Sequence, residues 1–328
     1  MPVNFSSEYK PSFFFKNNDI NTIFPNLTRK FRNFRYRRER IKTPDQDFID
    51  LDISSVNSKT AAIILHGLEG NSMRHYMIGM AESLNSIGID AVSFNFRGCR
   101  GEMNLKPHAY HSGFTEDLHE VINHTGKRYR QLYLIGFSLG GNMVLKYLGE
   151  KKYSVPGKIK KAFVFSVPCD LMSSSRRMLH IRNYFYSKRF LVMLTGKIRA
   201  KKFLFSEHPK KEKCGRIKSI TDFDNCYTAP MHGFSDASDY YKKSSSRQYL
   251  KNIKTPTEMI CSLDDPFLTE DCFPFAEAMS NRNINLTMYE YGGHMGFVQK
   301  GKKQTWLEEF TVREIGSEIN KSGKRANK

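Results

Sequence analysis

One serine in this sequence stands where its hydroxyl could act as a nucleophile. Ser138 lies in the peptide GFSLGG, between an apolar run at 131–137 and an apolar segment at 140–150. The run predicts a buried strand and the segment a helix, so the serine is expected on a tight strand-to-helix turn. Such a turn leaves little room for side chains beside the serine, which explains Gly136 and Gly140.

A reaction at this hydroxyl would need two backbone N–H groups to stabilise a developing oxyanion. The N–H of Leu139, at the start of the following helix, is the first candidate. The second is expected in the peptide HGLEG at 66–70, because that peptide ends the first buried run. We expect Leu68 to supply this group, with Gly67 as the alternative.

The hydroxyl also needs a general base, since serine is a poor nucleophile at its own pKa. Among ten histidines, the preferred base is His294, in the glycine-rich peptide YGGHMG after the last strand-like run. His66, at the end of the first buried run, competes with it. His108 and His111 have a metal-like H-x-x-H spacing, but no carboxylate or thiol cluster accompanies them. They are predicted to be structural, so the sequence predicts no metal and no cofactor.

An acid is needed to orient the base and to stabilise its protonated form. Asp264 and Asp265 follow the strand-like run 257–263 and precede His294, which gives the chain order serine, aspartate, histidine. We prefer Asp265 as the acid and expect the other aspartate to be a turn or cap residue. Asp170, after the run 161–167, is the weaker candidate.

The elements that must position these residues alternate along the chain. Helices are predicted at 75–87, 114–125 and 140–150, where apolar residues recur at helical spacing. Strands are predicted at 61–67, 91–96, 131–137, 161–167, 257–263 and 285–291. This alternation predicts an α/β fold with a mostly parallel central sheet and helices on both faces.

The alternation fails in two places, which suggests three parts. Residues 1–50 are expected to form a basic N-terminal arm that packs on the core. Residues 51–168 and 251–328 are expected to form the α/β core. The long segment 169–250 cannot easily be a structureless loop, so it is predicted to be a helical lid inserted over the carboxyl edge of the sheet.

Four apolar residues of the lid are candidates for contact with substrate: Phe185, Phe190, Met193 and Leu194. Three cations are interleaved with them: Lys188, Arg189 and Lys197. The favoured interpretation is that the apolar side chains cover the cleft while the cations are solvated. The alternative is a basic amphipathic surface that adsorbs to anionic lipid.

The charge of the chain is concentrated in two segments. Residues 29–42 carry eight Lys/Arg and one acid, and residues 176–218 carry fourteen Lys/Arg and two acids, so these segments hold the whole net charge of +19. They could face phospholipid or nucleic acid, or they could simply be solvated. Phe31, Phe34 and Tyr36 could stack on bases, but no nucleic-acid-binding signature is present, so nucleic acid is an unlikely partner.

Composition also excludes several classes of protein. No stretch reaches 18 consecutive apolar residues, so a transmembrane helix is not expected, and the N-terminus lacks the apolar region of a secretory signal. The six cysteines contain no C-x-x-C pair and are expected to be reduced thiols. A cytoplasmic location is therefore predicted, with peripheral contact to the inner membrane face as a further possibility. The oligomeric state is left open.

Taken together, the motifs resemble the YheT-like branch of the α/β-hydrolase superfamily, the AB-hydrolase family 4 type esterases. The matching peptides, between about residues 20 and 300, include HGLEGNS, NFRGCRGEMN, YHSGFTEDL, GFSLGGNM, SLDDPF and GGHMGF.

The resemblance implies a triad of Ser138, Asp265 and His294 that cleaves carboxylic esters through an acyl-enzyme. Its substrates would be short- to medium-chain acyl esters, or esters of acylglycerols and phospholipids. A thioesterase or an acyltransferase with the same triad is the alternative.

Overall fold

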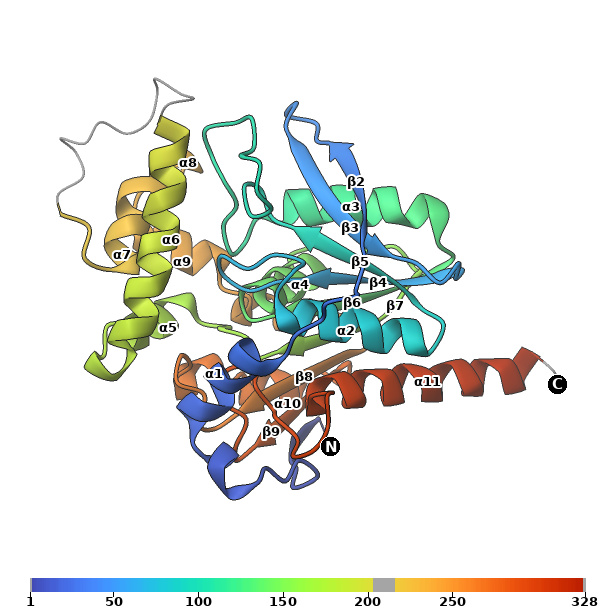
Figure 1. Cartoon of the computed structure of the whole chain (residues 1–328). Helices are drawn as coiled ribbons and strands as arrows, with labels where there is room; N and C mark the ends of the chain where they lie inside the picture. The colour runs from blue at the N-terminus through green and yellow to red at the C-terminus, as the bar shows by residue number, and fades with distance from the viewer. Residues whose placement is uncertain (1, 203–215, 327–328) are drawn as a thin grey trace.

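The central sheet has nine strands in the order β1-β9-β8-β7-β6-β4-β5-β3-β2, and the apolar runs of the sequence form its inner strands (Figure 1). The structure is a computed structural model that describes residues 2–202 and 216–326. The strands are β1 (Val3–Phe5), β2 (Arg37–Lys42), β3 (Phe48–Ser54), β4 (Thr60–Leu65), β5 (Asp90–Asn95), β6 (Gln131–Phe137), β7 (Ile159–Phe165), β8 (Thr257–Ser262) and β9 (Ile284–Tyr289). Each of the six strands that the sequence predicts lies within two residues of its expected bounds.

The sheet is mostly parallel. Strands β1, β9, β8, β7, β6, β4 and β5 pair in parallel, while β3 is antiparallel to β5 and β2 is antiparallel to β3. Residues 61–65 and 132–137 are buried on both sides of the sheet. That burial explains why these strands are continuous apolar runs rather than alternating ones.

Helices cover both faces of the sheet, and successive side chains of each strand point to opposite faces. On one face α2 (His75–Ser86) and α11 (Trp306–Ala326) form a core with Ile64 and Ile135. On the other face lie α3 (Thr115–Arg128), α4 (Leu139–Gly149) and α10 (Phe275–Ser280), which pack with residues such as Ile63 and Leu134. The predicted α/β architecture is confirmed.

The N-terminal segment contributes more regular structure than its sequence indicates. It supplies two of the nine strands, β1 and β2, together with the 3-10 helix η1 (Phe13–Lys16) and the helix α1 (Asn18–Thr28). The Asn17 side chain caps α1 by accepting hydrogen bonds from the N–H groups of Asp19 and Ile20, both at 3.0 Å. Strand β1 is three residues long, too short for a periodic pattern to reveal.

The segment 169–250 is helical where it is described. It contains α5 (Leu171–Met178), η2 (Ile181–Asn183), α6 (Tyr184–Lys202), α7 (Ile220–Phe223), η4 (Asp224–Thr228), α8 (Ala229–Met231), α9 (Ala237–Ser244) and η5 (Arg247–Asn252). Residues 203–215 of the predicted lid lie outside the described residues. Figure 1 shows α6 and α7 standing apart from the central sheet, with α5 leading back to it.

Two further expectations concern membranes and thiols. None of the helices in residues 2–202 and 216–326 has the length and apolar composition that a bilayer span requires. Cys99, Cys169, Cys261 and Cys272 are free thiols. Cys226 is disulfide-bonded, so the prediction of six reduced thiols is wrong at this residue. The absence of a C-x-x-C pair, on which the prediction rests, does not exclude a disulfide with another spacing.

Candidate active site

Ser138 sits on a strained turn between β6 and α4. Its backbone angles are φ 52° and ψ −117°, a region that residues with side chains rarely adopt. A Cβ atom on Gly136 would lie 2.6 Å from the Cα of Gly141, and one on Gly140 would lie 2.6 Å from the carbonyl oxygen of His66. Both glycines are therefore required by contact with neighbouring backbone, as the motif predicts.

Asp265 and His294 form a buried pair at the ends of neighbouring strands. The Nδ1 atom of His294 lies 2.8 Å from Oδ2 of Asp265, and both side chains are almost fully buried. The other carboxylate oxygen of Asp265 accepts the N–H of Phe267 at 2.9 Å. The Phe267 ring also lies against the imidazole, with ring centres 4.5 Å apart. The carboxylate is thus fixed by the backbone, and it fixes the imidazole in turn.

The other two candidate aspartates have different partners. Asp264 accepts the N–H of Gly293 at 2.9 Å and so holds the loop that carries the histidine. Burial raises the pKa of Asp264. Asp170 caps helix α5 by accepting the N–H of Ser173 at 2.8 Å. Of the three, it is Asp265 that the structure places against His294.

The peptide 66–70 packs directly on Ser138. A Cβ on Gly67 would lie 3.3 Å from the Cβ of Ser138. The N–H of Gly67 is already donated to the Tyr76 hydroxyl at 3.1 Å, which counts against this residue as an oxyanion donor. Within the part of the chain that the structure describes, the N–H groups of Leu68 and Leu139 donate to no protein acceptor. These two donors flank the serine and are available to an anion.

The remaining candidate histidines pack within the core or beside the cavity, and none of them lies against Asp265. His66 is completely buried, its Nε2 accepts the N–H of Phe96 at 3.1 Å, and burial lowers its pKa to about 3. The rings of His108 and His111 pack around His232, with centres 5.3 and 4.5 Å away. Among residues 2–202 and 216–326, no group of histidine, cysteine and carboxylate side chains is suited to hold a metal ion.

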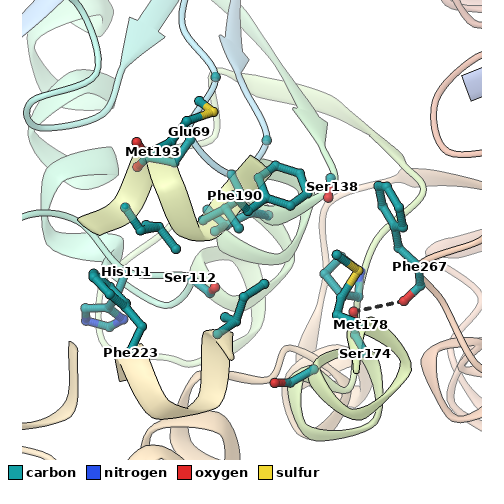
Figure 2. A pocket seen from close by; sticks show the side chains of 18 of the residues that line it. Glu69, His111, Ser112, Ser138, Ser174, Met178, Phe190, Met193, Phe223 and Phe267 are labelled. Carbon is teal, nitrogen blue, oxygen red and sulfur yellow. Dashed lines mark hydrogen bonds between the residues drawn. The ribbon is translucent and has the colours of Figure 1, made fainter. Parts of the chain in front are cut away.

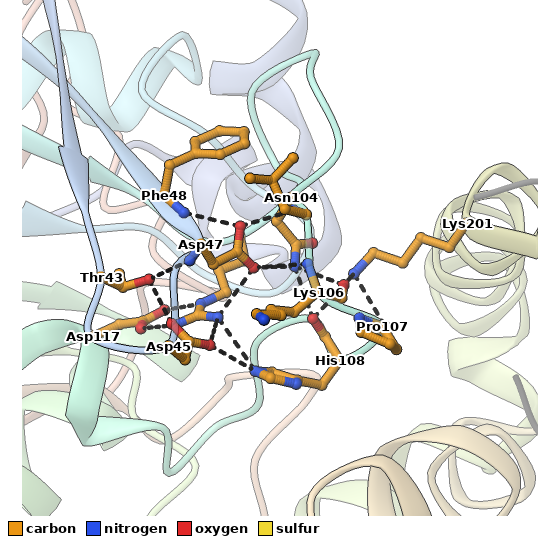
Figure 3. Close-up of polar contacts among 12 residues, drawn as sticks. Thr43, Asp45, Asp47, Phe48, Asn104, Lys106, Pro107, His108, Asp117 and Lys201 are labelled. Carbon is orange, nitrogen blue, oxygen red and sulfur yellow. Dashed lines mark hydrogen bonds and ion pairs between the residues drawn. The ribbon is translucent and has the colours of Figure 1, made fainter. Parts of the chain in front are cut away.

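A buried polar network supports the loop that carries His108 (Figure 3). Arg97 pairs with Asp45, Asp47 and Asp117 at 2.6, 3.1 and 2.6 Å. From helix α6, the Lys201 amine donates to the backbone carbonyls of residues 106, 107 and 108 at 3.0, 3.1 and 3.0 Å. Burial lowers the pKa of this amine to about 7.

A second lysine of α6 reaches the peptide beside Ser138. Lys197 is buried and forms an ion pair with Glu69 at 2.7 Å, next to Leu68. The expectation that Lys197 is a solvated cation of the lid is therefore wrong. Its charge is buried against a carboxylate because α6 lies on the 66–70 peptide rather than in water. The two lysines together tie α6 to the core.

Ser138 and His294 line one cavity of about 290 Å³, whose walls are largely apolar. Figure 2 shows Ser138 beside Phe190 and Phe267, whose ring centres are 6.2 Å apart. Of the predicted lid contacts, Phe190, Met193 and Leu194 line this cavity. Phe185 does not line it, since its side chain is 82% exposed on the outer face of α6. That prediction is wrong because the helical phase of α6 cannot be read from its mixed sequence.

The N-terminal helix α1 also reaches the site, which the sequence analysis missed. Thr22 Oγ1 accepts the N–H of His294 at 2.9 Å and donates to the carbonyl of Asn18 at 2.7 Å. The Asn18 amide donates to the carbonyl of Asp264 at 2.7 Å. Figure 1 shows α1 close to the ends of β8 and β9. The signal that could have revealed this contact is the polar row Asn18, Asn21 and Thr22, at helical spacing beside the apolar residues Ile20, Ile23, Phe24 and Leu27.

The family model and the sequence relatives that match this chain point to the same family. The α/β hydrolase fold family matches residues 61–300. An Escherichia coli (strain K12) protein named "Putative esterase YheT" is 32% identical over 92% of this chain and 91% of its own length. Mouse "Phospholipase ABHD3" is 31% identical over 81% of this chain and 67% of its own.

A solved structure, that of a Pyrococcus furiosus esterase, is similar with a TM-score of 0.56 at 18% identity, over 88% of this chain and 91% of that one. It supports the fold alone. The sequence relatives confirm the resemblance that the motifs indicate, and the chain belongs to the α/β hydrolase fold family, in which its similarity to YheT extends over nearly its full length.

Proposed function

We propose that this chain hydrolyses carboxylic esters, with Ser138 as nucleophile, His294 as base and Asp265 as orienting acid. The observation that carries the proposal is the buried Asp265–His294 pair opening on the same cavity as a serine in a strained turn. A carboxylate can only accept hydrogen bonds, so the Nδ1 atom of His294 is the donor and its Nε2 atom is left to accept a proton.

The chemical steps follow from these positions. His294 takes the proton of Ser138 as the hydroxyl oxygen attacks the ester carbonyl. The N–H groups of Leu68 and Leu139 stabilise the oxyanion, since neither is used within the described chain. His294 then protonates the leaving alcohol, and afterwards activates a water that releases the acyl group.

The apolar walls of the cavity support an ester with an apolar acyl chain. The curated relatives include a phospholipase and a yeast monoacylglycerol lipase, so we include esters of phospholipids and acylglycerols among the substrates. Within this proposal, the segment 169–250 acts as a lid that forms much of the cavity wall. The same triad would serve a thioesterase or an acyltransferase, which product analysis with water and alcohol acceptors would separate.

The basic segment 29–42 gives little support to nucleic acid as a partner. Arg38 and Arg40 pair with Asp52 and Asp50 at 2.9 and 2.7 Å. Tyr36 packs against the core and contacts Ser93 through its hydroxyl. We also propose a cytoplasmic location with peripheral membrane contact. The four free thiols support the cytoplasmic location, whereas the disulfide at Cys226 counts against it.

Ser138→Ala is the direct test. The variant should keep its fold and lose ester turnover by at least ~10⁴-fold, because the nucleophile is absent. Labelling with a fluorophosphonate probe should vanish in parallel. Ser280→Ala, which changes an exposed serine on α10, is the matched control and should label like the wild type. Turnover or labelling that survives in Ser138→Ala would remove Ser138 from the proposal.

A further inference from the structure

Helix α1 turns a polar face toward the protein and an apolar face toward the solvent. The residues that it buries are Asn21 and Pro25, while Ile20, Phe24 and Leu27 are 41%, 41% and 66% exposed. A surface helix of a folded domain normally buries its apolar stripe and exposes its polar one. The polar face of α1 is turned inward because it holds the loop of His294. The apolar face is left exposed, apart from the contact of Phe24 with the Phe15 ring, whose centre lies 5.0 Å away.

Neighbouring segments extend this apolar face. A groove on the surface is lined by Phe13, Phe14, Ile20, Phe24 and Lys300 together with residues 12 and 15. On the other side, η2 and the start of α6 are joined to α1, since Arg182 of η2 donates to Asn18 at 3.0 Å and Tyr186 of α6 donates to Asp19 at 3.1 Å. We name these exposed side chains the apolar rim: Phe13, Phe14, Ile20, Phe24, Leu27 and Phe185.

Four of the six residues of the apolar rim belong to helices α1 and α6, and both helices also line the cavity that holds Ser138. Ile23 and Asn26 of α1 line that cavity, and so do Tyr186 and Arg189 of α6. Figure 1 shows α1 on the side of the sheet that faces α5. A ligand that approaches across the rim would therefore meet the cavity directly.

The surroundings of the rim are positively charged. Lys16, Lys30, Lys188 and Lys300 are exposed, and none of them forms an ion pair with a carboxylate in the described part of the chain. Asp19, an acid next to Ile20 of the rim, is already engaged by Arg182 of η2 and Tyr186 of α6. Exposed aromatic and aliphatic side chains edged by lysine are the composition with which proteins bind anionic membrane surfaces.

We infer that the apolar rim docks on an anionic phospholipid bilayer, with the cavity opening turned toward the lipid. The inference rests on the proposed function, because it makes the bilayer the source of the ester. A protein or a second copy seated on the rim would cover the opening, whereas a bilayer supplies substrate there. Helix α1 is firmly attached to the rest of the protein, since the hydrogen bonds of Asn18 and Thr22 hold it against the loops that carry Asp264 and His294.

The test is sedimentation with vesicles of phosphatidylglycerol or of phosphatidylcholine. The wild type should bind phosphatidylglycerol vesicles at least ~fivefold more tightly than phosphatidylcholine vesicles, since only the former attract the lysines. A triple variant, Ile20→Ser, Phe24→Ser and Leu27→Ser, should bind phosphatidylglycerol vesicles at least ~tenfold more weakly. The matched control is Met279→Ser on α10, which removes an apolar side chain that is 64% exposed, away from α1; it should bind like the wild type.

Two measurements separate this inference from the proposed function. Ser138→Ala should bind vesicles like the wild type, although it turns over no ester. The triple variant should hydrolyse a water-soluble butyrate ester at the wild-type rate and lose activity only on vesicle-borne ester. The docking inference is overturned if the wild type ignores both vesicles, if the triple variant binds as tightly as the wild type, or if it loses activity on the soluble ester as well.

Discussion

The turn that carries Ser138 and the loop that carries His294 are built in different ways. The serine turn depends on two glycines that allow close approach of the backbone. A Cβ added to Gly136 would lie 2.6 Å from Gly141, and one added to Gly140 would lie 2.6 Å from the carbonyl of His66. The histidine loop is held by side chains far away in the chain, namely Thr22 and Asp265. Close backbone packing therefore positions the nucleophile, whereas hydrogen bonds from side chains far away in the chain position the base.

The largest effect is expected when the carboxylate of Asp265, which holds His294, is replaced. In Asp265→Asn, the amide can donate to His294 and so favours the wrong tautomer of the imidazole. We expect kcat to fall by roughly 10³–10⁴-fold with little change in KM, because binding of the ester is unaffected.

Steady-state kinetics on a soluble ester checks this prediction. Asp264→Asn is the control for the neighbouring carboxylate, which holds Gly293 rather than the imidazole. If the two variants were equally impaired, the acid would not be assigned to Asp265.

The next largest effect tests the close backbone packing of the serine turn. A methyl group on Gly140 would strike the carbonyl oxygens of Leu65 and His66 at 2.7 and 2.6 Å, so Gly140→Ala should lower the free energy of unfolding by about 3 kcal/mol. Gly316→Ala in α11 meets no atom within 4 Å and should instead be neutral or slightly stabilising. Denaturant unfolding of both variants measures the difference, and equal stabilities would show that the serine turn does not need this glycine.

The difference between the two regions also explains what could be predicted from the sequence. The strands, the serine turn and the order of Ser138, Asp265 and His294 follow from apolar runs and glycine spacing, which are local. The roles of Thr22, Lys197 and Lys201 could not be predicted, because each depends on which distant backbone or carboxylate it meets. Phe185 was misassigned for a related reason, since α6 mixes apolar and basic residues on all sides.

A smaller effect is expected at the N-terminal support of the base. Thr22→Val keeps the shape of the side chain but removes the acceptor for the His294 N–H. Leaving that donor without a partner costs about 1–3 kcal/mol, so kcat should fall about 10- to 100-fold while KM changes little. Thr22→Ser should restore the rate, because serine keeps the hydroxyl.

Thr28→Val is the matched control, since its hydroxyl bonds to the Phe24 carbonyl at the other end of α1. It should keep the wild-type kcat. A kcat loss in Thr28→Val equal to that in Thr22→Val would mean that α1 acts through its folding rather than through this hydrogen bond.

The smallest effect concerns helix α6, which Lys201 ties to the core through the carbonyls of residues 106–108. The Lys201 amine has its pKa lowered to about 7 by burial, whereas an unfolded chain keeps its lysine protons up to about pH 10. Between these values the unfolded state binds more protons, so this residue makes stability rise with pH, by at most ~1.4 kcal/mol per pH unit. Lys201→Met should remove the rise of stability between pH 7 and 9, whatever its effect on the absolute stability. Lys188→Met, on the exposed face of α6, is the control and should leave the rise of stability in place. Identical slopes in all three proteins would show that the amine stays charged among the carbonyls, and helix α6 would then be held by a charged hydrogen-bond donor rather than by a neutral one.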